Sequence, residues 1–127
     1  MNLYKNILVC VTKQKNCERL IEAASEHRRE QGNLHVLHVA KNSWNILDNS
    51  SESEALEYLF EISKSYGAEM TVLRNNNISE TIAEFAKQQE IELIVLGESS
   101  NENENKFLKQ LRFILKDEPI KIIEIKH

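Results

Sequence analysis

The sequence predicts an α/β protein built on a five-stranded, mostly parallel, doubly wound sheet with helices on both faces, a Rossmann-like arrangement. Two observations predict this fold class. Short unbroken apolar runs alternate along the chain with longer segments whose apolar residues recur at helical spacing. The resulting order, β-α-β-α-β-α-β-α-β, implies parallel strands joined by right-handed crossovers. We expect residues 1–127 to form a single domain, because this length supplies one core and not two.

The first strand and helix open the chain. The apolar run at residues 7–11 is β-branched and unbroken, which is typical of a strand covered on both faces. Asn16 is a candidate cap for the helix that follows, and Gly32 is expected to end that helix. A second short apolar run predicts a strand at residues 34–39.

The middle of the chain begins with a polar connection rich in serine and asparagine. Ser51 and Glu54 then form a candidate capping box for a helix that runs to Gly67. The third strand is expected at residues 68–73.

The last part of the chain repeats the alternation twice. Asn77 and Glu80 are expected to cap a helix, which leads into a fourth strand at residues 92–96. The final helix stops at Pro119, and the fifth strand is expected at residues 120–125. The apolar positions of the final helix are Phe107, Leu108, Leu111, Ile114 and Leu115.

Composition argues against several classes of protein. The net charge of −4 predicts neither nucleic-acid binding nor attraction to an anionic membrane surface. No apolar run approaches the roughly 20 residues that span a bilayer, and the first residues do not resemble a signal peptide. Cys10 and Cys17 are too few for a disulfide framework and fit no zinc pattern, so we expect reduced thiols in a cytoplasmic protein. Cys17 is more simply a small buried side chain than a reactive thiol activated by a helix start.

Ligands of an open doubly wound sheet bind beyond the carboxyl ends of the strands, where the direction of winding switches. The loop after Gly97 precedes a helix, and a strand, loop and helix start in this order can hold phosphate. His35 and His38 lie three apart on one strand and point to opposite faces, so no metal site is expected. No nucleophile with a supporting base and no pair of carboxylates at strand ends can be assembled, which predicts a protein that is not an enzyme.

Four segments carry a resemblance to a known family: "NILVCVT", "LHV", "ISETIAEFAKQQEIELIVLG" and "EPIKIIEI". Together they resemble the universal stress protein family over nearly the whole chain, with Glu92 at the acidic position of the family pattern, directly followed by Leu93. The stretch "ILVCVT", followed by Arg19, Leu20 and Ile21, is similar to the universal-stress-type domain of Kdp-type potassium-sensing histidine kinases. The resemblance implies a role in stress response, osmosensing or signalling.

Members of this family that bind ATP carry Gly-x-x-Gly, nine residues, and then Gly followed by Ser or Thr. In this chain Gly97 matches the first glycine, and Ser100 replaces the second. Gln110 and Leu111 stand where the last two motif residues belong, and Thr12 replaces the acidic residue that ends the first strand of ATP-binding members. The resemblance therefore implies a member that lacks the ATP motif and needs no cofactor.

Charge in the same loop favours that interpretation. Glu98, Glu102 and Glu104 crowd the segment that would face a triphosphate. Each like charge at 4 Å costs about 1 kcal/mol even in bulk water. Lys106 and Lys109 follow and would offset part of this repulsion.

A small nucleotide-like ligand other than ATP remains compatible with the scaffold. Lys13, Lys15 and Lys41 would then neutralise its phosphates. The candidate binding residues implied by the family match, with Lys13 and Ser99 added on chemical grounds, are Thr12, Lys13, Val39, Leu96, Gly97, Ser99 and Ser100.

The fifth strand is expected at an edge of the sheet, where an apolar strand invites pairing with another chain. Members of the universal stress family commonly dimerise through this strand, so the resemblance implies a homodimer. Alternatively, Lys121 and Lys126 protect this edge and the protein is a monomer. Two alternative functions also stay open: an ATP-binding stress protein with a degenerate loop, and a pure interaction domain that binds no small molecule.

Overall fold

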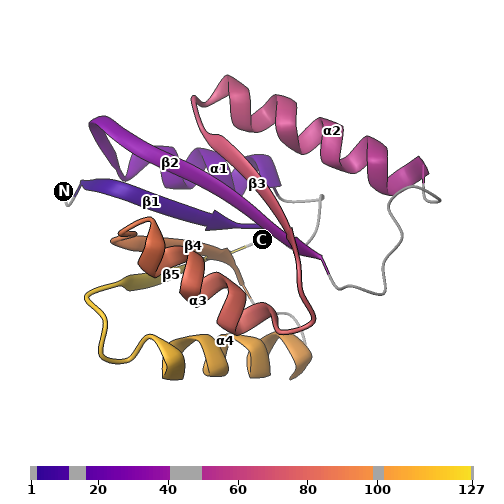
Figure 1. The fold of residues 1–127 in the computed structure, drawn as a ribbon. Coiled ribbons are helices and arrows are strands. Elements are labelled where there is room, and N and C mark those ends of the chain that lie inside the picture. Colours follow the sequence, from indigo (N-terminus) through magenta and orange to yellow (C-terminus); the bar gives the residue numbers. More distant parts are fainter. Residues whose placement is uncertain (1–2, 12–16, 41–49, 99–101, 127) are drawn as a thin grey trace.

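The computed structural model describes residues 3–11, 17–40, 50–98 and 102–126, with the side chains of 50–53 and 102–104 left out of the description. It forms a parallel sheet between two layers of helices (Figure 1). The elements are β1 (Tyr4–Cys10), α1 (Cys17–Glu26), β2 (Arg28–Ala40), α2 (Ser50–Ser65), β3 (Glu69–Arg74), α3 (Ile78–Gln88), β4 (Leu93–Gly97), α4 (Glu102–Ile114) and β5 (Lys121–Ile125).

The sheet has five strands in the order β3-β2-β1-β4-β5, and every neighbouring pair in this order is parallel. The predicted fold class is therefore confirmed. The chain winds outward from β1 through β2 to β3, then returns to lay β4 on the other side of β1 (Figure 1). This reversal places the winding switch between the carboxyl ends of β1 and β4.

Two apolar cores cover the two faces of the sheet. Because side chains alternate along a strand, Ile7 and Val9 of β1 pack toward α1 and α2, whereas Leu8 packs toward α3 and α4. These three side chains are 0% exposed. A strand buried on both faces reads as an unbroken apolar run, and this explains why β1 was visible in the sequence.

The end of α1 differs from the prediction. The helix stops at Glu26 rather than near Gly32, and β2 already begins at Arg28. The main-chain N–H of Tyr4 donates to the carbonyl of His27 at 2.8 Å, so pairing with β1 takes over the backbone directly after the helix. The prediction for this boundary was wrong because β2 extends six residues before its apolar part at Leu34.

Gly32 is required for a different reason. The β1–β2 register shifts between the pairs at Tyr4 and Asn6, and Gln31 within the irregular segment has φ 65°. A Cβ on Gly32 would lie 2.9 Å from the carbonyl oxygen of Arg29 and 3.0 Å from that of Lys5. The glycine therefore permits a close backbone approach inside a bulged strand and does not cap a helix.

The end of the final helix also differs from the prediction, since α4 ends at Ile114 and not at Pro119. The N–H of Lys116 donates to the carbonyl of Phe113, three residues back, so the backbone has already left the helix for a turn. The first strand begins three residues earlier than predicted, at Tyr4.

Several other predicted boundaries are confirmed to within a residue or two. Gly67 follows α2 with φ 68°, as a helix-ending glycine does. The side chain of Asn77 accepts from the N–H of Glu80 at 3.4 Å and caps α3. α2 begins at Ser50, one residue before the predicted cap at Ser51, whose side chain lies outside the described part.

Glu92 joins three strands at the amino end of the sheet. Its Oε1 accepts from the main-chain N–H groups of Lys5 at 2.7 Å and Asn6 at 3.1 Å. Its own N–H donates to the carbonyl of Asn6 at 2.9 Å, and its carbonyl accepts from Lys121 at 3.0 Å. One residue thus links the starts of β1, β4 and β5, which gives a structural reason for an acid directly before β4.

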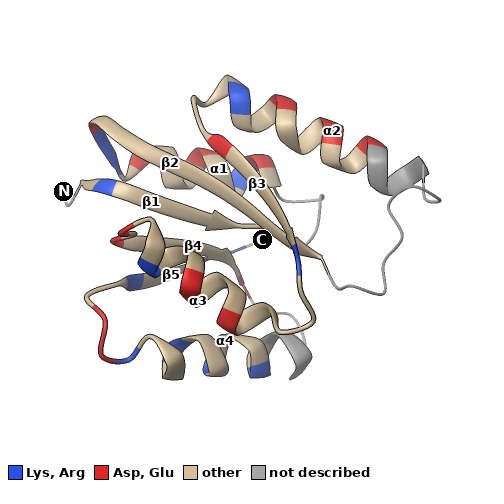
Figure 2. Cartoon of the chain, viewed as in Figure 1, with Lys and Arg blue, Asp and Glu red and all other residues tan. Residues whose placement is uncertain are grey.

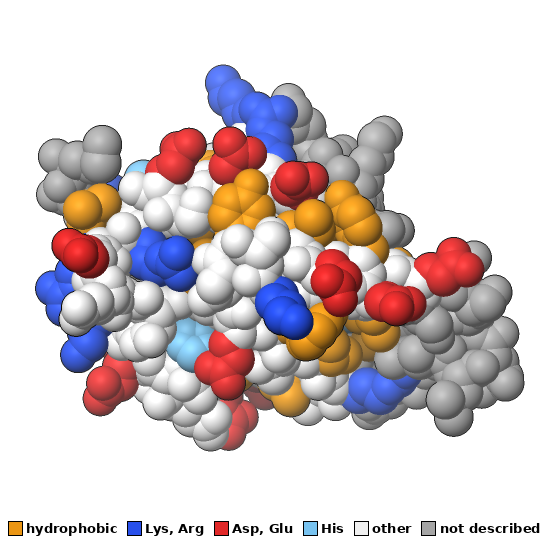
Figure 3. Space-filling model, turned by 90° about the horizontal axis from the view of Figure 1, so that it is seen from above, with side chains coloured by type: hydrophobic (Ala, Val, Ile, Leu, Met, Phe, Trp, Pro, Cys, Tyr) orange, Lys and Arg blue, Asp and Glu red, His pale blue; other side chains and the backbone are white. Residues whose placement is uncertain are grey.

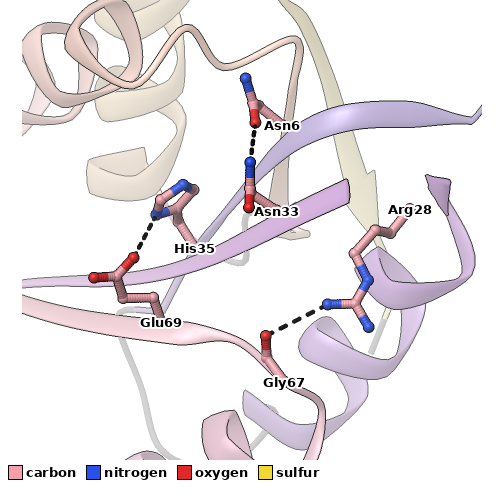
Figure 4. A network of polar contacts seen from close by, with 6 residues as sticks. All are labelled: Asn6, Arg28, Asn33, His35, Gly67 and Glu69. Carbon is pink, nitrogen blue, oxygen red and sulfur yellow. Dashed lines mark hydrogen bonds and ion pairs between the residues drawn. The ribbon is translucent and has the colours of Figure 1, made fainter. Parts of the chain in front are cut away.

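Polar side chains continue this edge toward β2 and β3 (Figure 4). Asn33 donates to Asn6 Oδ1 at 2.9 Å, which ties β2 to β1. Arg28 reaches the carbonyl of Gly67 at 3.5 Å, at the turn before β3. The amino edge of the sheet is therefore fixed by side chains as well as by the strand ladders.

Replacing Glu92 tests its role directly. Glu92→Ala leaves two main-chain donors without their carboxylate, and because water reaches this edge we expect a loss of about 1 kcal/mol in the free energy of unfolding. Glu92→Gln keeps an acceptor oxygen and is expected to lose less than half as much. Urea unfolding at neutral pH measures both variants, with Lys5→Ala as a control that keeps the main-chain donor. Equal losses for Ala and Gln, or no loss for Ala, would contradict this account.

Candidate functional site

The candidate site lies at the carboxyl ends of β1, β2 and β4, beside the winding switch. Val39, Leu96 and Gly97 are the predicted site residues that the structure describes. The other predicted residues and the three lysines proposed for phosphate lie outside the described residues: Thr12, Lys13, Lys15, Lys41, Ser99 and Ser100.

Val39 and Leu96 belong to one apolar cluster on the α3–α4 side of the sheet. Val39 is 8% exposed and Leu96 is 5% exposed. Their side chains therefore help to form the core beneath the strand ends, and little of either surface is left for a ligand. Gly97 is partly buried at the last position of β4, paired with Ile125 of β5.

The main chain that follows Gly97 is still part of the sheet. The N–H of Glu98 donates to the carbonyl of Ile125 at 2.9 Å, which extends the β4–β5 ladder one residue beyond the strand. A backbone nest holds a phosphate through several successive N–H groups that point at it. Because the Glu98 donor is already used, any such nest would have to begin later in the loop.

The main chain at the end of β1 is also occupied. The N–H of Val11 donates to the carbonyl of Leu37 at 3.0 Å. His38 Nδ1 lies 2.8 Å from the carbonyl oxygen of Val11, a hydrogen bond that requires the proton on Nδ1. The prediction that His38 is packed and hydrogen-bonded is confirmed. Both main-chain polar groups of Val11 serve the fold.

Side-chain charge at this end of the sheet is mixed. Glu98 is exposed directly after β4, and Arg74 is exposed at the end of β3 (Figure 2). Lys106 and Lys109 are exposed on α4. Glu98 opposes a highly charged anion at the switch itself, whereas the lysines stand further along the helix.

The two cysteines are buried and unsuited to nucleophilic chemistry. Burial raises the pKa of Cys10 to about 12 and raises the pKa of Cys17 above its ordinary value. Cys17 is 0% exposed although it opens α1. A thiol that stays protonated is a poor nucleophile, so the interpretation of Cys17 as a small buried side chain is confirmed.

The histidines of β2 lie on opposite faces, as predicted. His35 packs edge-on against Phe85 of α3, with ring centroids 5.9 Å apart, and lies 3.9 Å from a carboxylate oxygen of Glu69 (Figure 4). Burial lowers the pKa of His35, and Glu69 offsets part of this effect. His35 therefore belongs to the core and its rim and lies away from the candidate site.

Residues 3–11, 17–40, 50–98 and 102–126 contain no group of three or more His, Cys, Asp or Glu residues that could hold a metal ion. In the same ranges no helix combines the length and the apolar character that crossing a membrane requires.

A groove between α3 and α4 was missed in the sequence. It encloses about 450 Å³, and its lining residues are Asn77, Ser79, Glu80, Lys109, Gln110, Phe113 and Ile114. The Ser79 hydroxyl is buried at its floor, 3.2 Å from Gln110 Oε1. The available signal was Phe113, an aromatic residue that does not fit the apolar stripe of α4 and is 68% exposed.

Comparison with curated proteins gives no significant match. A family model described as "Universal stress protein family" matches residues 3–111 of the chain.

Solved structures of universal stress proteins share the fold. The protein from Archaeoglobus fulgidus is 20% identical with a TM-score of 0.66, over 98% of this chain and 95% of that one. The universal stress protein from Archaeoglobus fulgidus in complex with dAMP is 23% identical with a TM-score of 0.63, over 94% of this chain and 97% of that one. A universal stress protein in complex with cAMP is 12% identical with a TM-score of 0.68, over 98% of both chains. At these identities the similarity shows the fold.

Proposed function

This chain belongs to the universal stress protein family, and from that premise we propose that it is a non-enzymatic regulatory module of stress response or signalling in the cytoplasm. In this proposal it lacks the ATP-binding glycine motif, responds to a small nucleotide-like ligand and acts as a homodimer. One observation carries the proposal: the main chain directly after β4 is still bonded within the sheet, because the N–H of Glu98 donates to the carbonyl of Ile125.

The positions that would complete the ATP motif support this proposal. Gln110 and Leu111 stand where ATP-binding members have glycine and a hydroxyl residue, and both lie inside α4. Leu111 is 0% exposed in the core, and its carbonyl accepts from Leu115 at 3.0 Å. Within a helix the main-chain N–H groups are already bonded four residues back. Neither position is suited to hold a phosphate.

A ligand with fewer charges suits the same crevice better than a triphosphate. Glu98 places one carboxylate at the switch point, and its repulsion grows with the charge of the ligand. Two similar structures contain dAMP and cAMP, each with a single phosphate. We therefore infer a nucleoside monophosphate or a cyclic nucleotide as the ligand class, bound around Gly97 and the predicted residues Thr12, Lys13, Ser99 and Ser100.

Thermal unfolding with a panel of nucleotides tests this proposal. Mg·ATP is expected to leave the Tm unchanged, whereas at least one mononucleotide or cyclic nucleotide raises it. At a ligand concentration about 100-fold above Kd the stabilisation is about 2.7 kcal/mol, which corresponds to several degrees. The panel contains ATP, ADP, AMP, cAMP and a cyclic dinucleotide.

Two variants locate the effect. Gly97→Glu is expected to abolish the rise in Tm, while Gln89→Glu, which adds the same charge near the amino end of the sheet, keeps it. Circular dichroism confirms that both variants fold. A rise of several degrees with Mg·ATP that Gly97→Glu abolishes would favour the alternative function, an ATP-binding stress protein with a degenerate loop.

We propose that the homodimer forms through β5. Among the described strands, β5 lies at an edge of the sheet and pairs with β4 alone. The N–H of Lys121 points to β4, where it donates to Glu92. Because alternate residues of a strand point the same way, the N–H of Ile123 also faces β4, and those of Ile122 and Glu124 face outward. These outward donors can pair with a second copy of β5.

A proline on the free edge tests the dimer. Glu124→Pro removes an outward donor without removing a bond to β4, and we expect it to convert a particle of twice the 14.8 kDa chain mass into a single chain. Glu124→Ala is the matched control, because it removes the same side chain and its contact with Arg112 at 3.8 Å but keeps the N–H. Light scattering after gel filtration at high salt measures the mass. A wild-type protein that is already a single chain at high concentration would contradict the dimer.

We further infer that the chain is close to the universal-stress-type domain of Kdp-type potassium-sensing kinases. The similar stretch ends in Arg19, Leu20 and Ile21 at the start of α1. Leu20 and Ile21 are buried in the α1–α2 core, so packing alone explains them. Arg19 is exposed, so packing of the core does not explain it. It is therefore the residue of this stretch that supports the resemblance.

A further inference from the structure

The outward side of α4 is basic. Residues 106–116 contain four basic residues and no acidic residue, in a chain with 20 acidic and 16 basic residues overall. Lys106, Lys109, Phe113 and Lys116 recur at helical spacing on the exposed side, and we call them the lysine stripe. Phe113 is 68% exposed, and Lys116 Nζ lies 4.5 Å from its ring centroid. Phe113 is thus an apolar side chain within an otherwise basic exposed side.

The outward side of α2 is mostly acidic, with Lys64 as a base in its last turn. Glu54, Glu57 and Glu61 are all exposed at positions i, i+3 and i+7, and we call them the glutamate stripe. Tyr58 and Phe60 flank this stripe with 42% and 52% exposure. Figure 3 looks onto the side of the molecule that carries α2, and acidic side chains there surround hydrophobic ones.

The two stripes lie on opposite faces of the sheet, with α2 in one helical layer and α4 in the other (Figures 1 and 2). They can therefore meet only between two molecules. Lys109 and Lys116 are seven residues apart, as are Glu54 and Glu61, which span about 10.5 Å along α2. Lys116 lies two residues beyond the end of α4 at Ile114, where the backbone continues as a turn. Antiparallel contact would set Lys109 against Glu61 and Lys116 against Glu54.

The groove beside the lysine stripe offers a place for an aromatic side chain. Phe113, Ile114 and the stem of Lys109 form its α4 wall. Tyr58 already has a polar contact, 3.5 Å from Glu18 Oε2, whereas Phe60 exposes an entirely apolar ring. Phe60 of a second copy is therefore the better fit for the groove.

We propose that the lysine stripe of one molecule docks on the glutamate stripe of a second copy, with Phe60 seated in the α3–α4 groove. The two surfaces differ, so the contact is head-to-tail and leaves a free stripe at each end, which lets it propagate. The surfaces lie on the helical layers and not on β5, so this contact is independent of the strand-mediated dimer proposed above. Exposed charge pairs are weak and screened by salt, so the association is expected only at high protein concentration and low ionic strength.

A charge exchange tests the proposal. Sedimentation velocity at protein concentrations up to about 0.5 mM compares low salt, where the Debye length is about 30 Å, with 1 M salt, where it is about 3 Å. The wild-type weight-average mass is expected to rise with concentration at low salt only. Lys109→Glu with Lys116→Glu, and separately Glu54→Lys with Glu61→Lys, each abolish the rise. Mixing the two double variants restores it, because each then offers the stripe that the other lacks.

Three further measurements complete the design. Lys5→Glu with Arg29→Glu makes the same charge change at the amino end of the sheet and is expected to associate like the wild type. Phe60→Ala is expected to weaken the association without removing its salt dependence. The ATP and β5 experiments are unaffected by these substitutions, so failure here is separable from failure of the proposed function.

The proposal is overturned if the wild-type mass does not depend on concentration at low salt. It is also overturned if the mixture of double variants stays unassociated. In that case, binding of the wild type to vesicles of an anionic lipid, lost in the Lys109→Glu, Lys116→Glu variant, would assign the lysine stripe to a membrane surface instead.

Discussion

The attachment of Glu92 to three strands is the constraint on which the site depends. Its carboxylate holds the N–H groups of Lys5 and Asn6 in β1, and its main chain bonds both β1 and β5. From that edge the β1–β4 register runs without a shift from Ile7–Leu93 to Val9–Val95. The β4–β5 register likewise runs without a shift to the pair formed by Gly97 and Ile125.

The same register limits what the opposite edge can bind. Pairing between Gly97 and Ile125 lets the sheet continue through the N–H of Glu98, and Val11 is bonded on both its main-chain groups. The main-chain groups of Val11 and the N–H of Glu98 are therefore not available to an anion at the winding switch. A main-chain N–H that is bonded within the sheet cannot also donate to a phosphate. A ligand with one phosphate needs fewer main-chain donors from this loop than a triphosphate does.

The sequence alone predicted the presence of the strands well and the ends of α1 and α4 badly. Strands buried on both faces leave unbroken apolar runs, so β1, β4 and the apolar half of β2 were visible. Gly32 was misread because a glycine suits both a helix end and a close backbone approach, and only the position of Lys5 and Arg29 decides between them. The acid at Glu92 was noticed as part of a family pattern, but its partners come from residues 86 and 87 positions away.

The sequence predicted the location of the candidate site better than the roles of its individual residues. Fold class gives the strand ends as the binding edge, and Gly97 lies there. Val39 and Leu96 lie there too, but their side chains turn into the core, which follows from strand parity and not from a motif. Thr12, Lys13, Ser99 and Ser100 stay predictions. The α3–α4 groove and the two charged stripes depend on which helix sides face outward, and this requires the packed structure.

Hydrogen exchange at the Glu98 amide is the most direct measurement of the central claim, that the backbone after β4 serves the sheet and not a phosphate. Nuclear magnetic resonance of the free protein and of the protein with Mg·ATP reports it residue by residue. The account predicts protection of this amide in the free protein, comparable to that of β4, and no change with Mg·ATP. Rapid exchange in the free protein that slows when Mg·ATP is added would contradict it.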